Sequence, residues 1–416
     1  MSKLKKTTLA TALLLVTAQS SAAGFQVSEH SASGLGRAFS GEAAVADNAS
    51  VLARNPAAMS RFKKAEISIV GSYVAPNVDI IGTQDGSAVG GNNPSRLNND
   101  DIAPGAAIPA AYFILPLNEN VAVGLAMFSS YGVTTEYADN YAAGTLGGTT
   151  ELVTFNINPN ISFKVSDQLS LGLGVSAVYG TASLERNYGD LNPPTPGTAV
   201  FTLEGDDWGL GWNAGVLFEL NDNNRFALAY RSQVDIEFSG SFKGSDSRQQ
   251  QVDTDSASLD LPLAATAEFS AYHKLSNAFA VSYGVVWTQW SKYEKLAAQS
   301  AECTNNLCFE KIEHFDDNLR YAIGAEYTID SLVLRAGIAY DQAAGETTLN
   351  IPETDRRWYT AGASYNVSSN FSVDVGLAYV ASDDVEFTET DKAGQTYGFK
   401  SEGDAIIASA QANYRF

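Results

Sequence analysis

Apolar and polar residues alternate along most of the chain from residue 65 to residue 416. Every second residue from Leu169 to Tyr179 is apolar, and serine or glycine fills most positions between them. The same alternation recurs at 210–220, 279–287, 332–341 and 371–382. A period of two residues predicts strands with one apolar face, and each run has the roughly nine to eleven residues that cross a bilayer at a tilt. Strands of a soluble β-sandwich are typically shorter, at about five or six residues.

Short and long polar connections alternate between the expected strands. Short turns lie at 118–120, 166–168, 221–224, 276–277, 330–331 and 368–370, and long loops at 82–104, 138–149, 186–206, 243–256, 298–310, 345–354 and 388–403. Outer-membrane barrels have short periplasmic turns, long external loops and an even number of strands. We count fourteen segments of strand length after residue 64. The predicted fold class is therefore an all-β, multi-pass membrane protein, a 14-stranded antiparallel β-barrel of the bacterial outer membrane with both termini periplasmic.

The end of the chain agrees with this prediction. The alternation continues from Ile406 to the terminal Phe416, which is typical of the last strand of an outer-membrane barrel. Aromatic residues near the expected strand ends fit the girdles that such proteins place at the membrane surfaces. The residues expected in these girdles are Tyr112, Tyr230, Trp287, Trp290, Trp358 and Tyr359.

Residues 23–64 lack the alternation and are rich in small residues, with a few apolar anchors such as Phe25, Leu35 and Phe39. This composition predicts a compact, mainly helical or irregular piece. A barrel of fourteen strands encloses a lumen that its own side chains do not fill. We therefore expect residues 23–64 to form an N-terminal hatch inside a barrel made of residues 65–416. A closed lumen implies controlled passage of a particular compound.

The first 22 residues have the pattern of a secretory signal peptide. Lys3, Lys5 and Lys6 precede a short apolar core at 9–18, and small residues at 20–22 suit cleavage before Ala23. A soluble N-terminal helix is the alternative. The apolar core is too short to span a bilayer, and the rest of the chain has no run of about eighteen apolar residues. The sequence therefore predicts an exported chain without a transmembrane helix.

The charge and the few histidines and cysteines narrow the possible partners. The chain has 26 Lys and Arg against 47 Asp and Glu, a net charge of −21, which argues against nucleic acid as a partner. The three histidines show no ligand-like spacing, so we expect neither a metal nor a cofactor. Cys303 and Cys308 lie in a polar loop, where an oxidising compartment favours a disulfide; a metal site is the alternative.

Several fragments occur in a fixed order behind the signal: AGFQ at 23–26, SGLGRAFSGE at 33–42, RNPA at 54–57 and WGLGWNAG at 208–215. Together with the strand count and the C-terminal strand, they resemble the FadL family of outer-membrane long-chain fatty acid transporters. The resemblance covers the whole chain after the signal. It implies passive uptake: external loops capture an apolar ligand, a lumen site binds it, the hatch rearranges, and the ligand leaves sideways through the wall.

The resemblance also implies partners and residue roles. The partners are a long-chain fatty acid or a similar apolar ligand and the outer-membrane lipid, and no catalytic residues are implied. A plugged single-pore barrel works as a monomer, so we expect a monomer, although the sequence leaves the oligomeric state open. Arg186 and Lys311 match the family's head-group positions, so both are implied to bind the fatty acid carboxylate. The alternative is a pair of solvated loop cations beside Glu185 and Glu310. A carboxylate needs such cations for orientation, while apolar lining holds its tail.

Five further residues are implied in hatch movement and in the exit. Phe25 matches a hatch aromatic that touches the deep pocket, with a plain buried anchor as the alternative. Asn55, Pro56 and Ala57 are implied in gating, although Pro56 also fits a fixed turn with Asn55 hydrogen-bonded locally. Gly132 matches a kink in the third strand that opens the wall. Glycine inside a strand marks a bulge or a close approach in any case.

One loop departs from the family pattern. The outer capture groove is implied between the loops after strands five and seven, but the second of these, at 244–253, is nearly all polar. The groove is therefore expected to be reduced or rearranged. A relative that carries aromatic hydrocarbons or other apolar compounds by the same route is the first alternative function. A barrel enzyme, an open porin and a surface or adhesive role are the others.

Overall fold

The computed structural model describes residues 24–86, 93–190 and 196–416, so the expected signal peptide lies outside the described residues. Within these ranges, twenty strand segments form one antiparallel sheet that closes on itself where β1 pairs with β20. The strand segments are β1 (Glu66–Gln84), β2 (Ala106–Pro116), β3 (Val121–Phe128), β4 (Gly132–Thr135), β5 (Thr149–Lys164), β6 (Leu169–Asn187), β7 (Ala199–Asn221), β8 (Asn224–Arg231), β9 (Val234–Ser245), β10 (Gln251–Leu263), β11 (Thr266–Lys274), β12 (Phe279–Thr288), β13 (Lys295–Gln299), β14 (Leu307–Ile312), β15 (Asn318–Ile329), β16 (Leu332–Asp341), β17 (Arg356–Asn366), β18 (Phe371–Ser382), β19 (Val385–Thr390) and β20 (Thr396–Arg415).

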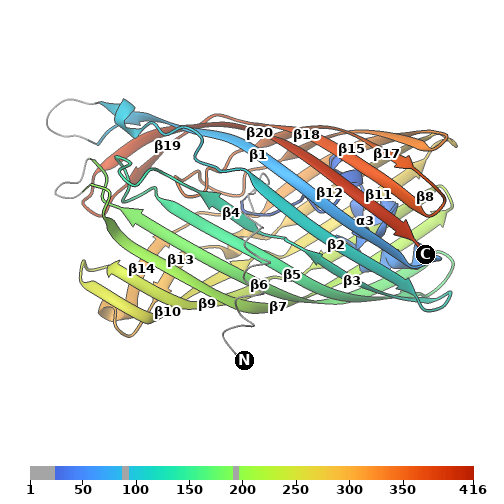
Figure 1. Cartoon of the computed structure of the whole chain (residues 1–416), viewed down its shortest axis with the longest axis horizontal. Coiled ribbons are helices and arrows are strands. Elements are labelled where there is room, and N and C mark those ends of the chain that lie inside the picture. Colours follow the sequence, from blue (N-terminus) through green and yellow to red (C-terminus); the bar gives the residue numbers. More distant parts are fainter. Residues whose placement is uncertain (1–23, 87–92, 191–195) are drawn as a thin grey trace.

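Six barrel strands contain a break and are therefore counted as two segments each. The broken strands are β3/β4, β8/β9, β10/β11, β12/β13, β14/β15 and β18/β19. The described chain thus crosses the wall fourteen times, and the prediction of a 14-stranded antiparallel barrel is confirmed. Figure 1 shows the tilted strands running between an end that carries β13, β14 and β19 and an end that carries the C-terminus.

The alternation of the sequence separates an outer from an inner face. Leu171, Leu173 and Val175 of β6 are 41–56% exposed, although all three are large and apolar. Their neighbours Ser170 and Ser176 are buried in the barrel. An outward apolar band with a polar interior is the arrangement that lipid requires of a barrel wall. In the described part of the chain, no helix is long and apolar enough to cross a membrane.

Several strands extend further than the alternation predicts. The expected loop 186–206 is shorter, because β6 continues to Asn187 and β7 begins at Ala199. In this extension Glu185 pairs with Thr202 and Arg186 with Phe201. Outside the lipid, a paired strand no longer needs an apolar outer face. The β6–β7 ladder therefore continues through polar residues whose sequence predicted a loop.

Three of the residues expected in the aromatic girdles lie inside the barrel instead. Tyr112, Trp290 and Trp358 are at most 1% exposed. The Tyr112 hydroxyl donates to the His30 carbonyl at 3.0 Å, and Trp358 packs edge-on against Phe39 at 6.3 Å. The prediction was wrong for these three because an aromatic residue near a strand end can also turn inward against the hatch. Tyr359, at 52% exposed, points outward as expected.

Residues 24–64 lie inside the barrel as a chain of short helices, toward the end that carries the C-terminus (Figure 1, blue). These are α2 (Ala32–Leu35), α3 (Glu42–Val45), η1 (Ala49–Ala53) and η2 (Pro56–Arg61); η3 (Pro94–Leu97), η4 (Trp290–Lys292) and η5 (Thr304–Asn306) lie further along the chain. Small residues such as Ala43, Ala44 and Ala57 are fully buried. They allow the helices to pack directly against the wall.

Charged wall residues hold this segment in place. Arg37 forms ion pairs with Glu42 at 2.6 Å, Asp47 at 2.9 Å and Glu326 of β15 at 3.0 Å. Four wall arginines donate to backbone carbonyls: Arg225 to Ala44 and Val45, Arg231 to Ala53, Arg320 to Ala38, and Arg415 to Asp47. Very short helices leave most of their carbonyls without internal partners, and these arginines satisfy several of them. These hydrogen bonds connect the segment to strands β8, β15 and β20 of the wall.

Candidate ligand-binding site

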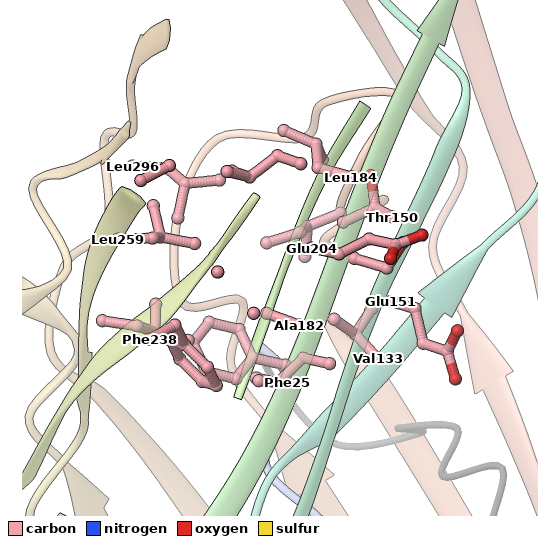
Figure 2. Close-up of a pocket in the computed structure, with 18 of the residues that line it drawn as sticks. Phe25, Val133, Thr150, Glu151, Ala182, Leu184, Glu204, Phe238, Leu259 and Leu296 are labelled. Carbon is pink, nitrogen blue, oxygen red and sulfur yellow. The ribbon is translucent and has the colours of Figure 1, made fainter. Parts of the chain in front are cut away.

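An apolar cavity lies in the lumen above the hatch (Figure 2). Its wall is formed by the inward faces of β5, β6, β7, β9 and β10, with Leu184, Leu203, Phe238 and Leu259 among its lining residues. Leu184 pairs with Leu203 across the β6–β7 ladder, and directly opposed residues project to the same face. In Figure 2 the carboxylate of Glu151 points away from the cavity. The arrangement suits an extended apolar ligand.

Phe25 of the hatch forms part of the cavity floor. Its ring packs edge-on against Trp290 at 4.5 Å, Tyr293 at 5.4 Å and Tyr131 at 6.0 Å. Gly24 precedes it with φ +64°, and a Cβ there would lie 2.5 Å from the Trp290 ring. The tight turn therefore requires glycine, and it presents Phe25 to the cavity.

Arg186 lies just beyond one end of this cavity without lining it: it follows Leu184 by two residues on the same face of β6, and it donates to the lining residue Thr150. The side chain is 2% exposed. Its guanidinium donates to the carbonyls of Thr149 (2.9 Å) and Glu185 (2.6 Å), to Thr150 Oγ1 (3.1 Å) and to Asn350 Oδ1 (2.6 Å). All four acceptors are neutral, and no carboxylate of the described residues lies within 4 Å of it. Arg186 is thus a buried cation next to the apolar lining of the cavity, and no carboxylate of the described residues contacts it.

Lys311 belongs to the same neighbourhood. It opposes Leu296 in the β13–β14 ladder, and Leu296 lines the cavity, so both side chains project to the cavity side. The Lys311 ammonium lies 3.7 Å from Glu389 and 3.9 Å from Glu313 and makes no hydrogen bond within the described chain. The same two carboxylates act electrostatically on Arg186. The structure therefore brings the two predicted head-group cations together around two acidic residues.

The external loop 342–355 connects this end of the cavity to the hatch. Asn350 accepts from Arg186 through its side chain and from Thr135 Oγ1 through its carbonyl, at 3.1 Å. Three residues further on, the buried Glu353 accepts from the Gly24 amide and lies 3.5 Å from Arg356. Sequence reasoning missed Asn350, Glu353 and Glu389, because nothing in a polar loop marks which residues fold back into the lumen.

The third barrel strand is broken next to the predicted kink. β3 pairs with β2 up to Met127, whereas β4, from Gly132, pairs with β5. In the intervening residues the hatch supplies partners: the Gly132 amide donates to the Phe25 carbonyl, and the Val27 amide donates to the Ser130 carbonyl, both at 2.8 Å. The backbone ladder between β2 and β4 is therefore interrupted, and the hatch segment 25–27 seals it from inside.

Asn55, Pro56 and Ala57 pack against the barrel wall. Asn55 caps η2 by accepting from the Ala57 amide at 2.9 Å, and its amide donates to Ala43 and Val216 carbonyls. A Cβ on the wall residue Gly215 would overlap the Asn55 side chain. The motif thus makes a close backbone contact with the wall that glycine permits.

The external loops contain the remaining predicted features. Cys303 and Cys308 are joined by a disulfide with a Cα–Cα separation of 5.1 Å. In the polar loop after β9, Asp246 accepts from the Arg248, Gln250 and Thr304 amides, so the loop is tied to the disulfide-closed tip. Phe201 stacks on Phe242 nearby, at 5.7 Å. In the described ranges no group of three or more His, Cys, Asp or Glu side chains is placed to hold a metal ion.

Solved structures share this architecture. A FadL homologue from Pseudomonas aeruginosa superposes with a TM-score of 0.83 at 20% identity, over 95% of this chain and 100% of its own. The Pseudomonas putida toluene transporter TodX gives a TM-score of 0.68 at 15% identity, over 95% of this chain and 100% of its own. At such low identity the likeness establishes the fold.

Relatives in sequence are considerably nearer. The chain is 40% identical to the 47 kDa outer membrane protein of Pasteurella multocida, over 100% of this chain and 99% of the relative. It is 37% identical to the long-chain fatty acid transport protein of Escherichia coli O6:H1, over 99% of this chain and 98% of the relative. A family model described as outer membrane protein transport protein (OMPP1/FadL/TodX) matches residues 13–416. This chain therefore belongs to the OMPP1/FadL/TodX family of outer-membrane transporters of hydrophobic molecules.

Proposed function

We propose that the protein takes up long-chain fatty acids passively across the outer membrane. The observation that carries this proposal is Arg186, a buried guanidinium just beyond the Thr150–Leu184 end of an apolar cavity, whose hydrogen bonds all go to neutral oxygens. A carboxylate is the natural additional partner of such a group, because charge-assisted bonds to arginine are shorter and stronger than neutral ones. Lys311 supplies a second positive charge at the same end.

The apolar lining accounts for most of the expected affinity. A fatty acid tail with about fifteen methylenes has roughly 12 kcal/mol of transfer free energy, at about 0.8 kcal/mol for each. One carboxylate–cation contact contributes about 1 to 4 kcal/mol, depending on the dielectric environment. The tail therefore provides the affinity, and the cations orient the head group.

We propose a route through the wall rather than along the barrel axis. External loops capture the ligand, which then binds in the cavity above Phe25. Movement of the hatch segment 25–27 removes the backbone partners of Ser130 and Gly132 and opens the interrupted ladder between β2 and β4. The proposal treats residues 23–64 as the hatch, Asn55–Ala57 as its contact with the wall, and one barrel as the transporting unit.

Uptake of aromatic hydrocarbons by the same route is the second candidate. The fold is shared with a solved toluene transporter, and the cavity lining is apolar whichever ligand it holds. A hydrocarbon would leave Arg186 and Lys311 without a role in binding. This difference separates the two candidates experimentally.

The test is uptake by cells that lack their own long-chain transporter, with and without this protein. Labelled oleate and labelled toluene are supplied in parallel, and an Arg186→Ala, Lys311→Ala double variant is compared with the parent. We expect oleate uptake that falls at least tenfold in the double variant. Toluene uptake without oleate uptake would refute the fatty acid proposal in favour of the second candidate.

A further inference from the structure

Another cavity lies beneath the hatch segment 25–27. Phe25 lines the upper cavity, whereas Gln26 and Val27 line the lower one, so this short segment separates the two. The hatch residues Ala53 and Arg54 form part of its lining. It lies between this segment and the rest of the hatch, so that movement of the segment would connect it with the upper cavity.

The lower cavity carries an excess of positive charge. Arg231 of β8 donates to Ser176 Oγ at 2.8 Å and to the Ala53 carbonyl at 3.1 Å, and lies 5.1 Å from the centre of the Phe128 ring. These partners are neutral, and no ion pair joins Arg231 to another described residue. Arg231 therefore resembles Arg186 in being a lumenal cation held by neutral groups.

Two other polar groups of this cavity are incompletely satisfied. Arg54 lies 3.7 Å from Glu268, while its Nε has no hydrogen-bond partner among the described residues. Glu268 is already engaged, since it accepts from the Ala43 amide at 3.0 Å and Ser270 Oγ at 2.6 Å. His30 is 6% exposed, and its Nδ1 also lacks a partner within the described chain. The lining thus contains two guanidinium groups and one carboxylate, next to buried polar atoms without a hydrogen-bond partner in the described chain.

The apolar part of the lining leads to the broken strand. Phe128, Ser130 and Tyr131 of the third strand line this cavity, and the ladder between β2 and β4 is interrupted there. A head group at Arg231 would therefore place its apolar chain along Phe128 and Tyr131, beside the interruption. The cavity combines a cation for an acid with an apolar path toward the wall.

We infer that the cavity around Arg54 and Arg231 is a second head-group site, which receives the carboxylate of an acidic amphiphile after it leaves Arg186 and Lys311. The inference rests on the proposed fatty acid function. When the segment 25–27 moves, the carboxylate passes from one pair of cations to the next without standing uncompensated among apolar groups. The site explains why cations line the lumen below Phe25 as well as above it.

The test compares an acid with a neutral ligand of the same chain. Labelled oleate and labelled oleyl alcohol are supplied to cells lacking their own transporter that express the parent, Arg231→Gln, Arg54→Gln or Arg225→Gln. Arg225 is the matched control, because it lies on the same strand and anchors the hatch through the Ala44 and Val45 carbonyls. It lines neither cavity. Heat-modified gel mobility confirms that each barrel is folded.

We expect Arg231→Gln and Arg54→Gln to lower oleate uptake at least fivefold while oleyl alcohol uptake stays within twofold of the parent. Arg225→Gln should change both ligands by the same factor. Arg231→Lys, which keeps the charge, should restore most of the oleate uptake. Equal loss of acid and alcohol in Arg231→Gln, or no loss at all, would overturn this inference alone. Absence of oleate uptake by the parent would overturn the proposed function as well.

Discussion

Neutralising Glu389 should tighten the binding of fatty acids. Glu389 lies 3.7 Å from Lys311 and accepts from the Leu349 amide at 2.6 Å. A glutamine can still accept from that amide, so Glu389→Gln removes the charge and keeps the contact. The Coulomb attraction between Lys311 and Glu389 is about 1 kcal/mol in water and about 4 kcal/mol at an effective dielectric constant of 20. Removing it frees Lys311 for the ligand.

The magnitude follows from the repulsion between Glu389 and an incoming carboxylate. A carboxylate hydrogen-bonded to Lys311 would lie roughly 6 Å from Glu389, where two like charges repel by about 1 to 3 kcal/mol. Loss of this repulsion corresponds to about 5- to 150-fold tighter binding. The prediction is thus a gain of affinity from a single substitution, which general damage to the protein does not produce.

The assay is displacement of a fluorescent fatty acid from the purified protein by oleate and by oleyl alcohol. Glu389→Gln should lower the Kd of oleate and leave that of the alcohol unchanged. Glu310→Gln is the control, because Glu310 pairs with the exposed Lys295 at 3.0 Å on the same hairpin. Unchanged or weaker oleate binding in Glu389→Gln would refute the placement of the head group beside Lys311.

Two further predictions concern the hatch. Burial raises the pKa of Glu353 to about 7, against the lowering effect of Arg356. While Gly24 of the hatch is bound to Glu353, this carboxyl therefore keeps a proton that it releases when the hatch segment detaches. Binding of the hatch segment to Glu353 thus weakens as the pH rises from about 5 to 8. Hydrogen-exchange protection of the Val27 amide should fall over this range in the parent and stay constant in Glu353→Gln; a constant parent would contradict this. Gly215→Ala places a methyl group into Asn55 at a cost of about 1 to 3 kcal/mol. It should raise single-channel conductance in planar bilayers, unlike Gly71→Ala, whose methyl group meets no atom within 4 Å. Equal conductance in both variants would contradict a role of the contact between Asn55 and the wall in closing the lumen.

The barrel was predictable because lipid imposes its pattern on the sequence. Wherever a strand faces the bilayer, as from Leu171 to Val175, each outward residue must be apolar, and the alternation can be counted. Inside the lumen no such rule holds. Trp290 and Trp358 are aromatic and lie near strand ends, as girdle residues do, but their rings pack against Phe25 and Phe39 of the hatch. The ends of the strands were misplaced for a related reason, since pairing continues after the lipid constraint has ended.

The site was only partly predictable. Arg186 and Lys311 were found through family resemblance, and their own neighbourhood, with Glu185 and Glu310 beside them, suggested solvated loop cations. Contacts such as Asn350 with Arg186 and Glu353 with Gly24 join residues 164 and 329 positions apart. Such pairs depend on how an external loop folds back into the lumen, and no local pattern encodes that. The amino-acid composition of this loop could identify neither Asn350 nor Glu353 as a site residue.

The anchoring of the hatch by wall arginines restricts the order in which the protein can assemble. Arg225, Arg320 and Arg415 bind hatch carbonyls and come from strands spread over the second half of the chain. The barrel closes where β1 pairs with β20, the first strand with the last. Once this seam has formed, a segment of some forty residues can no longer enter between the first and the last strand. A hatch that docks after closure would have to enter through an end of the barrel, whereas one that docks earlier would be enclosed by the closing wall.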